Sequence, residues 1–198
     1  PRPLQTPHPP VWCPSQGSTE TVEWAAKRRF PYLMVFTPIK RIAQIYGEYR
    51  EACERYGYKA SRYQLTVNVP VVVAESDAKA RELAQKHVMW VFNVGLRMHP
   101  PFWRPPSLRR LLANPPTLPS ELTFEEAERD GYLIYGSPAT VRDKLRIFAD
   151  ELEAGILCTA MNGGSHERTL ELIRLFAEEV MPHFREDAHV DETAGVGR

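Results

Sequence analysis

The chain has 198 residues, of which 43% are hydrophobic and 25% are charged, values that are ordinary for a globular domain. Lys and Arg together number 25, as do Asp and Glu, so the composition gives no electrostatic reason to expect a nucleic acid or an anionic membrane as a partner. No apolar run approaches the roughly 18 residues that a membrane span needs, and no signal peptide is apparent.

Strand and helix patterns alternate along the first part of the chain. A short strand is expected near residues 10–13, and the segment TETVEWAAKRR that follows it is expected to be helical. The continuous apolar run PYLMVF, residues 31–36, has the length and composition of a strand buried on both faces. Apolar side chains then recur at three- and four-residue steps over residues 42–56, which predicts a helix that ends at Gly57.

A further strand and helix precede an interruption of this pattern. β-branched residues fill positions 64–74 and predict a strand, in which Pro70 indicates a bulge or an edge position. Asp77 is expected to cap a helix that extends to about Val91. Residues 95–130 then form an insertion, and its first part is so rich in proline that a long regular element is excluded.

The insertion contains both apolar and basic residues, and its role can be interpreted in two ways. Phe102 and Trp103 lie close to several arginines, among them Arg97 and Arg104. An ordered excursion of this kind can act as a lid that closes over a site and excludes water. Alternatively, it is an exposed loop whose aromatic side chains pack locally or at a subunit interface. A plain flexible linker is disfavoured, because so many apolar side chains need cover.

The last part of the chain contains clear boundary signals. Ser137 and Pro138 are expected at the N-cap and first position of a helix that stops at Gly155. Residues 156–161 predict a strand, and a closing helix is expected to end at Pro182. Residues 1–185 are therefore expected to form one domain, with residues 186–198 as a flexible tail.

Strand–helix alternation repeated about four times predicts an α/β fold with a parallel sheet and helices packed outside it. A complete (β/α)8 TIM-type barrel needs about 250 residues. Four units, interrupted by the proline-rich insertion, therefore correspond to half a barrel. A small open doubly wound sheet is the competing architecture.

Small and hydroxyl-bearing residues stand where the first strand gives way to its helix. Gly17, Ser18 and Thr21 lie at the expected helix N-terminus, with Ser18 at the N-cap and Thr21 one turn later. Backbone N–H groups at such an end are unpaired and carry partial positive charge, so they can bind phosphate. Ser18 is equally well explained as an ordinary N-cap, and the residues alone leave both readings open.

Other candidate residues carry weaker signals. His166 is expected at the start of the last helix, where it can face a ligand or simply solvent, and Gly163 and Gly164 can admit a ligand or turn the chain. Neither the histidines nor the cysteines have metal-ligand spacing, so no metal site is expected. Cys13 and Cys158 are expected in the core. Three widely separated cysteines fit the cytoplasm better than an oxidising compartment.

Three segments in the same order resemble the C-terminal half of the luciferase-like flavin-dependent monooxygenases. They are QTPHPPVWCPSQGSTETVEWAAKRRFPYL, YGSPATVRDKL and MNGGSHERTLELIRLFAEEVMP, and the resemblance extends over about residues 3–185. It implies a (β/α)8 barrel that binds reduced FMN or coenzyme F420 and acts on a small organic substrate. In that family the loop after the fifth strand holds the flavin phosphate, which implies that Gly17, Ser18 and Thr21 bind it here.

The resemblance also implies that the family's first four strands have no counterpart in this sequence. The chain opens with Pro1, Arg2 and Pro3 rather than Met, as the later part of a longer polypeptide would. A missing N-terminal half can complete the barrel, a second copy can do so in a homo-oligomer, or the chain is a remnant without activity. Two other functions are weighed: a non-catalytic partner subunit, and a phosphate-handling isomerase or aldolase, for which no catalytic Lys or Glu is obvious.

Overall fold

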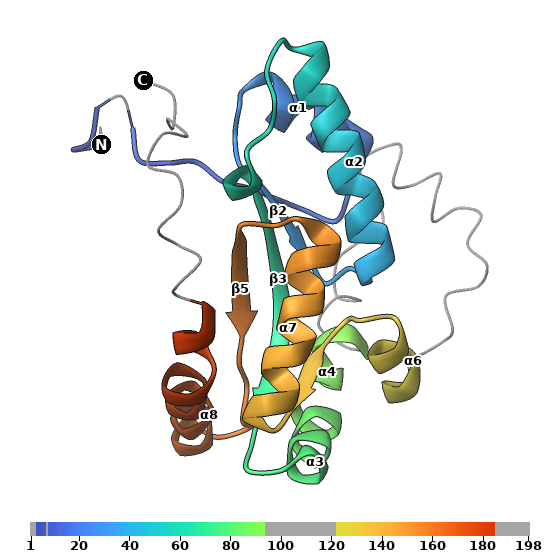
Figure 1. The fold of residues 1–198 in the computed structure, drawn as a ribbon, viewed down its shortest axis with the longest axis vertical. Coiled ribbons are helices and arrows are strands. Elements are labelled where there is room, and N and C mark those ends of the chain that lie inside the picture. The colour runs from blue at the N-terminus through green and yellow to red at the C-terminus, as the bar shows by residue number, and fades with distance from the viewer. Residues whose placement is uncertain (1–2, 7, 94–121, 185–198) are drawn as a thin grey trace.

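Parallel strands form the central layer of the chain, whose computed structural model describes residues 3–6, 8–93 and 122–184 (Figure 1). Strand β3 lies in the middle, paired with β2 and β5, and β1 extends the sheet beyond β2. The short strand β4 pairs with the last residues of β3. All pairs are parallel, which confirms the expected α/β fold. The strands are β1 (Cys13–Ser15), β2 (Tyr32–Val35), β3 (Leu65–Val73), β4 (Ile134–Gly136) and β5 (Ile156–Ala160).

Helices follow the strands in sequence. In α1, α3, α7 and α8 the residue at the N-cap is a serine whose hydroxyl accepts a hydrogen bond from the backbone N–H three residues later. These helices are α1 (Thr19–Lys27), α2 (Ile39–Arg55), α3 (Asp77–His87), α4 (Met89–Asn93), α6 (Phe124–Arg129), α7 (Pro138–Leu152) and α8 (His166–Glu179), with 3-10 turns η1 (Arg62–Gln64) and η4 (Met181–Phe184).

One face of the sheet is buried beneath helices. Tyr32 and Met34 of β2 point to the same side as Val67 and Val69 of β3, because residues in register on parallel strands share a face. These four side chains are at most 3% exposed. Buried side chains of α1, α2 and α7 belong to the same apolar cluster, so this face forms the main core.

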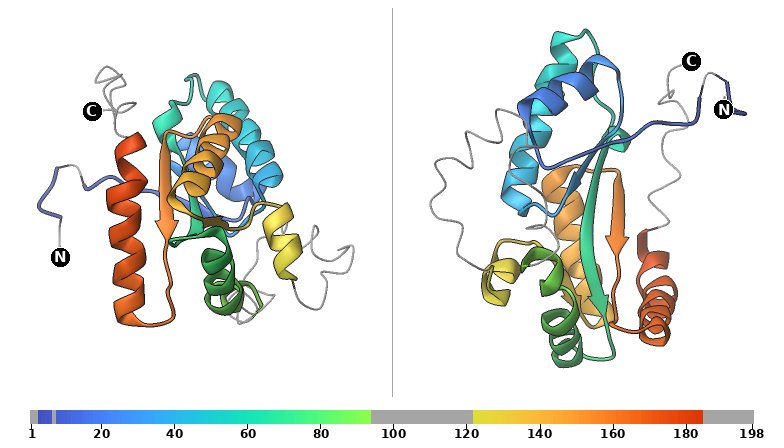
Figure 2. Two further views of the ribbon diagram at one scale, coloured as in Figure 1. Left: turned by 60° about the horizontal axis from the view of Figure 1, so that its bottom comes forward. Right: turned by 180° about the vertical axis from the view of Figure 1, so that it is seen from behind.

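The other face of the sheet is incompletely covered. Leu33 and Val35 of β2 point to this side, together with Asn68 of β3 and Cys158 and Ala160 of β5, and all five are only half-buried. Seen from behind, no described helix crosses this face of β3 and β5 (Figure 2). Parallel sheets are normally covered on both faces. A parallel sheet with helices on one face only is the arrangement expected of part of a (β/α) barrel.

Several element boundaries differ from the sequence-based expectations. The first strand is Cys13–Ser15 rather than residues 10–13, because these residues are the ones that pair with β2. The helix after β3 is capped by Ser76, not Asp77, and is broken at Val88 into α3 and α4. The closing helix ends at Glu179, and Pro182 lies within η4.

The edge position proposed for Pro70 is wrong, since β3 is the central strand. Proline is tolerated there because β3 pairs with β2 only up to Asn68 and with β4 only from Val71, so neither of these strands needs an N–H group from Pro70, whose one partner in the described sheet is Ala160 of β5. Strand β4 itself was not expected. The predictions for residues 95–121 and for the tail fall outside the described residues, whereas residues 122–130 of the expected insertion include α6.

Candidate functional site

The structure brings Gly17, Ser18 and Thr21 together at the carboxyl end of β1. The Ser15 hydroxyl accepts a hydrogen bond of 3.0 Å from the Gly17 N–H. The Ser18 hydroxyl accepts one of 3.3 Å from the Thr21 N–H and lies 2.6 Å from the Thr21 hydroxyl. Ser18 is therefore the N-cap of α1 and is 4% exposed. The predicted place of Ser18 at the N-cap, with Thr21 one turn later, is confirmed.

Glycine at position 17 is required by the protein's own packing. Its φ angle of +90° favours glycine, and a Cβ atom there would lie 2.8 Å from Cγ1 of Ile45. Position 17 therefore has no room for a side chain whether or not a ligand is present. Gly17 shapes the loop that presents Ser18 and Thr21.

Two backbone donors remain available at this helix end. Within the described part of the chain, the N–H groups of Ser18 and Thr19 have no hydrogen-bond acceptor. They stand at the end of α1 that carries partial positive charge. The Thr21 hydroxyl is close by, so two backbone donors and one hydroxyl lie within one turn of helix.

A second helix shows what such an end binds in this protein. Ser137 and Thr140 stand at α7 in the same relation as Ser18 and Thr21 at α1, with hydroxyls 3.1 Å apart. There the Asp77 carboxylate accepts hydrogen bonds from the Ser137 N–H, at 2.6 Å, and from the Thr140 hydroxyl, at 3.1 Å. These two contacts lower the pKa of Asp77. The α7 end is thus filled by an anion from the chain itself, and no described carboxylate does the same for α1.

Three buried tyrosines lie in the core between the sheet and α2. Tyr32 of β2 stacks on Tyr49 of α2 at 5.4 Å, and the Tyr49 hydroxyl donates to the Phe30 carbonyl oxygen. The Tyr46 hydroxyl donates to the Thr66 carbonyl oxygen. Burial raises the pKa of Tyr32 to about 12 against a smaller lowering by the Ser15 hydroxyl, and the Tyr32 hydroxyl has no partner at hydrogen-bond geometry within the described residues. The apolar stripe predicted for α2 included Tyr46 and Tyr49, but nothing in the pattern indicated their hydrogen bonds.

Residues near the end of β5 serve the protein's own packing. His166 is exposed in the first turn of α8, on the opposite side of the sheet from β1. Gly164 has a φ angle of +83°, and a Cβ atom there would lie 2.1 Å from the His87 ring. A Cβ atom at Gly163 would lie 2.8 Å from the backbone of α8. Gly164 therefore serves the turn before α8, and Gly163 lets the chain pass close to the α8 backbone.

The incompletely covered sheet face contains two unsatisfied polar atoms. Oγ1 of Thr66 and Oδ1 of Asn68 are buried and have no hydrogen-bond partner in the described residues. Cys158, expected in the core, is instead half-buried on this face beside Asn68, because β5 has only β3 as a neighbour in the described sheet. These atoms would face the interior of a closed barrel.

Asn93, just before the expected insertion, is joined by hydrogen bonds to Leu122, within its last part, a feature that the sequence did not reveal. The Asn93 amide group donates to the Leu122 carbonyl oxygen and accepts from the Leu122 N–H, both at 3.0 Å. Arg81 of α3 also pairs with Glu125 and Glu128 of α6. The chain therefore leaves and re-enters the fold at one fixed place.

Among the residues that the structure describes, no group of three or more His, Cys, Asp or Glu is placed to hold a metal ion. None of the helices in the described ranges has the length and apolar character that crossing a bilayer requires.

Comparison with solved structures places the fold. The chain is similar to the monooxygenase RslO1 from Streptomyces bottropensis, with a TM-score of 0.66 and 18% identity over 93% of this chain and 51% of that chain. It is similar to the oxygenating constituent of 3,6-diketocamphane monooxygenase from Pseudomonas putida, solved in complex with FMN, with a TM-score of 0.64 and 21% identity over 88% of this chain and 49% of that one.

The third similarity is to the coenzyme F420 dependent tetrahydromethanopterin reductase from Methanopyrus kandleri. Its TM-score is 0.56, with 19% identity over 88% of this chain and 51% of that one. The chain thus spans about half the length of these solved relatives, which agrees with a partial barrel. A search of curated proteins gave no match. The sequence matches the family model described as luciferase-like monooxygenase over residues 1–152, more than half of its length, so this chain belongs to that family.

Proposed function

We propose that this chain supplies the phosphate-binding part of a flavin-dependent oxidoreductase. The phosphate of FMN or of coenzyme F420 would bind at the N-terminus of α1, between the Ser18 and Thr19 N–H groups and the Thr21 hydroxyl. One observation carries the proposal: the Ser18 and Thr19 N–H groups have no acceptor among the described residues, whereas the matching end of α7 already binds the Asp77 carboxylate. Two solved relatives support the cofactor class, one named for bound FMN and one for F420.

The chain's own residues would position the cofactor. The bound flavin would supply the redox chemistry. The rigid loop between Ser15 and Ser18 would hold the phosphate where the carboxyl ends of the parallel strands meet, the edge at which barrel enzymes build their sites. The buried free thiols of Cys13 and Cys53 fit a cytoplasmic enzyme.

The site would be completed by further βα units. The chain spans about half of its solved relatives, and its sheet has one incompletely covered face with unsatisfied atoms at Thr66 and Asn68. Four more units would close the barrel over this face and would hold the isoalloxazine ring and a small organic substrate. We infer that they lie on the same natural polypeptide; a second copy in a homo-oligomer is the other source.

Comparison of FMN with riboflavin tests the phosphate site directly. In the natural polypeptide that carries this chain, Ser18→Ala combined with Thr21→Ala should weaken FMN binding about tenfold and leave riboflavin binding unchanged, as followed by flavin fluorescence. The matched control is Ser137→Ala combined with Thr140→Ala, at the helix end that Asp77 already fills. Equal weakening of both flavins, or of neither, would remove the assignment.

The same titration separates the proposal from a non-catalytic role. A partner subunit or scaffold of the same fold would be purified without colour and would leave the fluorescence of added FMN unchanged. That result would favour the scaffold. An intact mass of the natural product above 22.7 kDa would show that further units lie on the same chain.

A further inference from the structure

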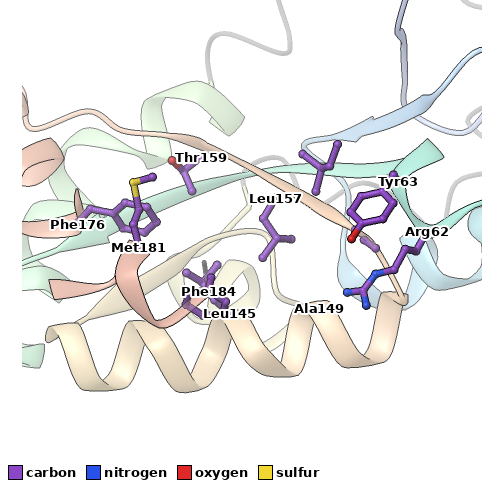
Figure 3. Close-up of a pocket in the computed structure, with 12 residues that line it drawn as sticks. Arg62, Tyr63, Leu145, Ala149, Leu157, Thr159, Phe176, Met181 and Phe184 are labelled. Carbon is purple, nitrogen blue, oxygen red and sulfur yellow. The ribbon is translucent and has the colours of Figure 1, made fainter. Parts of the chain in front are cut away.

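A cavity of about 390 Å³ lies on the helix-covered side of the sheet, along strand β5. Its floor is formed by α7 and its walls by β5, α8 and the two 3-10 turns (Figure 3). Cavities of this volume lie in the range that binds small molecules, about 300–1,000 Å³. The lining residues are Arg62, Tyr63, Leu145, Ala149, Ala154, Gly155, Ile156, Leu157, Thr159, Phe176, Met181 and Phe184.

This cavity is separate from the proposed phosphate site. Leu157 and Thr159 point to the same face as Val67 and Val69, which is the helix-covered face. The α1 loop follows β1 at the other end of the sheet. The two sites can therefore be tested independently.

The walls of the cavity are apolar, and several of their side chains are only partly buried by the rest of the protein. Leu157, Phe176 and Phe184 are half-buried, and Met181 is 40% exposed. The lining follows β5 from Ile156 to Thr159, which are about 10 Å apart at the usual rise per residue of a strand. The space is elongated and suits a linear hydrocarbon chain better than a compact polar molecule.

One end of the cavity is cationic. Figure 3 shows Arg62 and Tyr63 at one end and Phe176 and Met181 at the other. Arg62 is the sole charged residue of the lining and forms no ion pair with any described carboxylate. The nearby Arg50, in contrast, pairs with Glu153 at 3.0 Å. The Arg62 side chain is exposed, with its guanidinium 5.9 Å from the centroid of the Tyr63 ring, so the carboxylate of a ligand in the cavity can reach it.

We propose that this cavity binds an amphipathic carboxylate, with its linear hydrocarbon tail along β5 and its carboxylate on the Arg62 guanidinium. Two features of the cavity argue for this class. Its apolar walls extend along β5 and favour transfer of a hydrocarbon chain out of water. The Arg62 guanidinium has no ion pair with a described carboxylate and can pair with the carboxylate of a ligand. The Thr159 hydroxyl also lines the cavity, farther along β5 from Arg62.

Calorimetric titration with decanoate, decan-1-ol and decylammonium tests the head group. Decanoate should bind one molecule per chain, more tightly than decanol, and decylammonium should bind most weakly. Arg62→Gln should weaken decanoate binding about tenfold and leave decanol binding unchanged, while Arg146→Gln, an exposed arginine of α7 outside the cavity, should change neither. Equal affinity of the wild-type chain and Arg62→Gln for decanoate would overturn the proposal.

Filling the cavity tests its location. Ala149→Leu adds three carbons on the α7 floor and should abolish binding of decanoate and of decanol alike. Ala139→Leu makes the same change at an exposed position of the same helix and should leave both affinities unchanged. Saturable binding that survives Ala149→Leu, or no saturable binding to the folded wild-type chain, would rule out this site. A mass doubled in solution, and restored by Ala149→Leu, would show instead that another copy fills the cavity.

Discussion

The Asp77 carboxylate accepts a hydrogen bond of 2.6 Å from the backbone N–H of Ser137, across 60 residues of sequence. The same carboxylate accepts from the Thr140 hydroxyl at 3.1 Å. It joins the first turn of α3 to the first turn of α7 and neutralises the positive end of α7. These two helices follow β3 and β4, so the contact fixes one side of the barrel wall.

The Asp77 contact makes stability depend on pH. The hydrogen bond from Ser137, and then that from Thr140, lower the pKa of Asp77 from its ordinary value of 3.8. The stabilisation is therefore present above about pH 4 and is lost as the pH falls through the lower pKa of the folded state. Asp77→Asn should be less stable than the wild type in urea at pH 7, and the two should converge at acid pH.

A neighbouring carboxylate provides the control for this prediction. Asp143 is exposed on α7 and has no ion pair with a described residue. Asp143→Asn should track the wild type at every pH. If the difference in unfolding free energy between Asp77→Asn and the wild type stays constant from pH 7 to pH 2, the negative charge of Asp77 does not contribute to the stability of the contact.

Substitution of Gly17 should separate backbone strain from overpacking. Gly17→Ala places a methyl group 2.8 Å from Ile45 at a φ angle of +90° and should destabilise the fold by about 3 kcal/mol. Gly57 has a similar φ angle of +80° with no atom within 4 Å, so Gly57→Ala should cost only about 1 kcal/mol. Urea denaturation followed by circular dichroism measures both. Equal losses would mean that Ile45 moves aside at little cost.

Two stacked tyrosines should respond in opposite ways to loss of the hydroxyl group. Tyr49→Phe removes a hydrogen bond of 2.8 Å to the Phe30 carbonyl oxygen and should cost about 1 kcal/mol at pH 7. Tyr32→Phe removes a buried hydroxyl without a partner among the described residues and should be neutral or stabilising.

Alkaline pH provides a second measurement on the same pair. Burial raises the pKa of Tyr32 to about 12, so the folded state disfavours ionisation and loses stability as the pH rises above about 10. Tyr32→Phe should reduce this alkaline loss. A destabilised Tyr32→Phe at pH 7 would reveal a hydrogen bond that the geometry does not show.

The two hydrogen bonds between the Asn93 side chain and the Leu122 backbone should control hydrogen exchange at the Leu122 amide. Asn93→Ala removes both hydrogen bonds to Leu122, and the Leu122 amide proton should then exchange faster with solvent. Asn93→Asp keeps an acceptor for that N–H and should preserve most of its protection. Hydrogen exchange measured by NMR distinguishes the two, and equal protection in all three proteins would assign the order at Leu122 to other contacts.

Local sequence patterns predicted the long elements well. The apolar steps of α2, the β-branched run of β3 and the signals at Ser137 and Gly155 each reflect interactions within one element, so they can be read without knowledge of the fold. Strand β4 was missed because its three residues are too few for a period. Pro70 was misread because its tolerance depends on where β2 stops and β4 starts.

The candidate site could be predicted only in part. Ser18 and Thr21 were identified from the loop itself, and their arrangement as a cap and a paired hydroxyl is confirmed. The meaning of Gly17 depends on Ile45, which lies 28 positions later, and the contrast with α7 depends on Asp77, which lies on another helix. Contacts of this kind leave no periodic trace in a sequence.

The central position of β3 also has a consequence for how the chain folds. On one side β3 pairs with β2, about thirty residues earlier, but its pairing with β5 joins Thr66 to Ile156, ninety positions apart. Closing so large a loop is entropically costly, and proteins dominated by such distant pairings fold slowly. During synthesis the first three strands can assemble early, while the second edge of β3 waits for β5 to leave the ribosome.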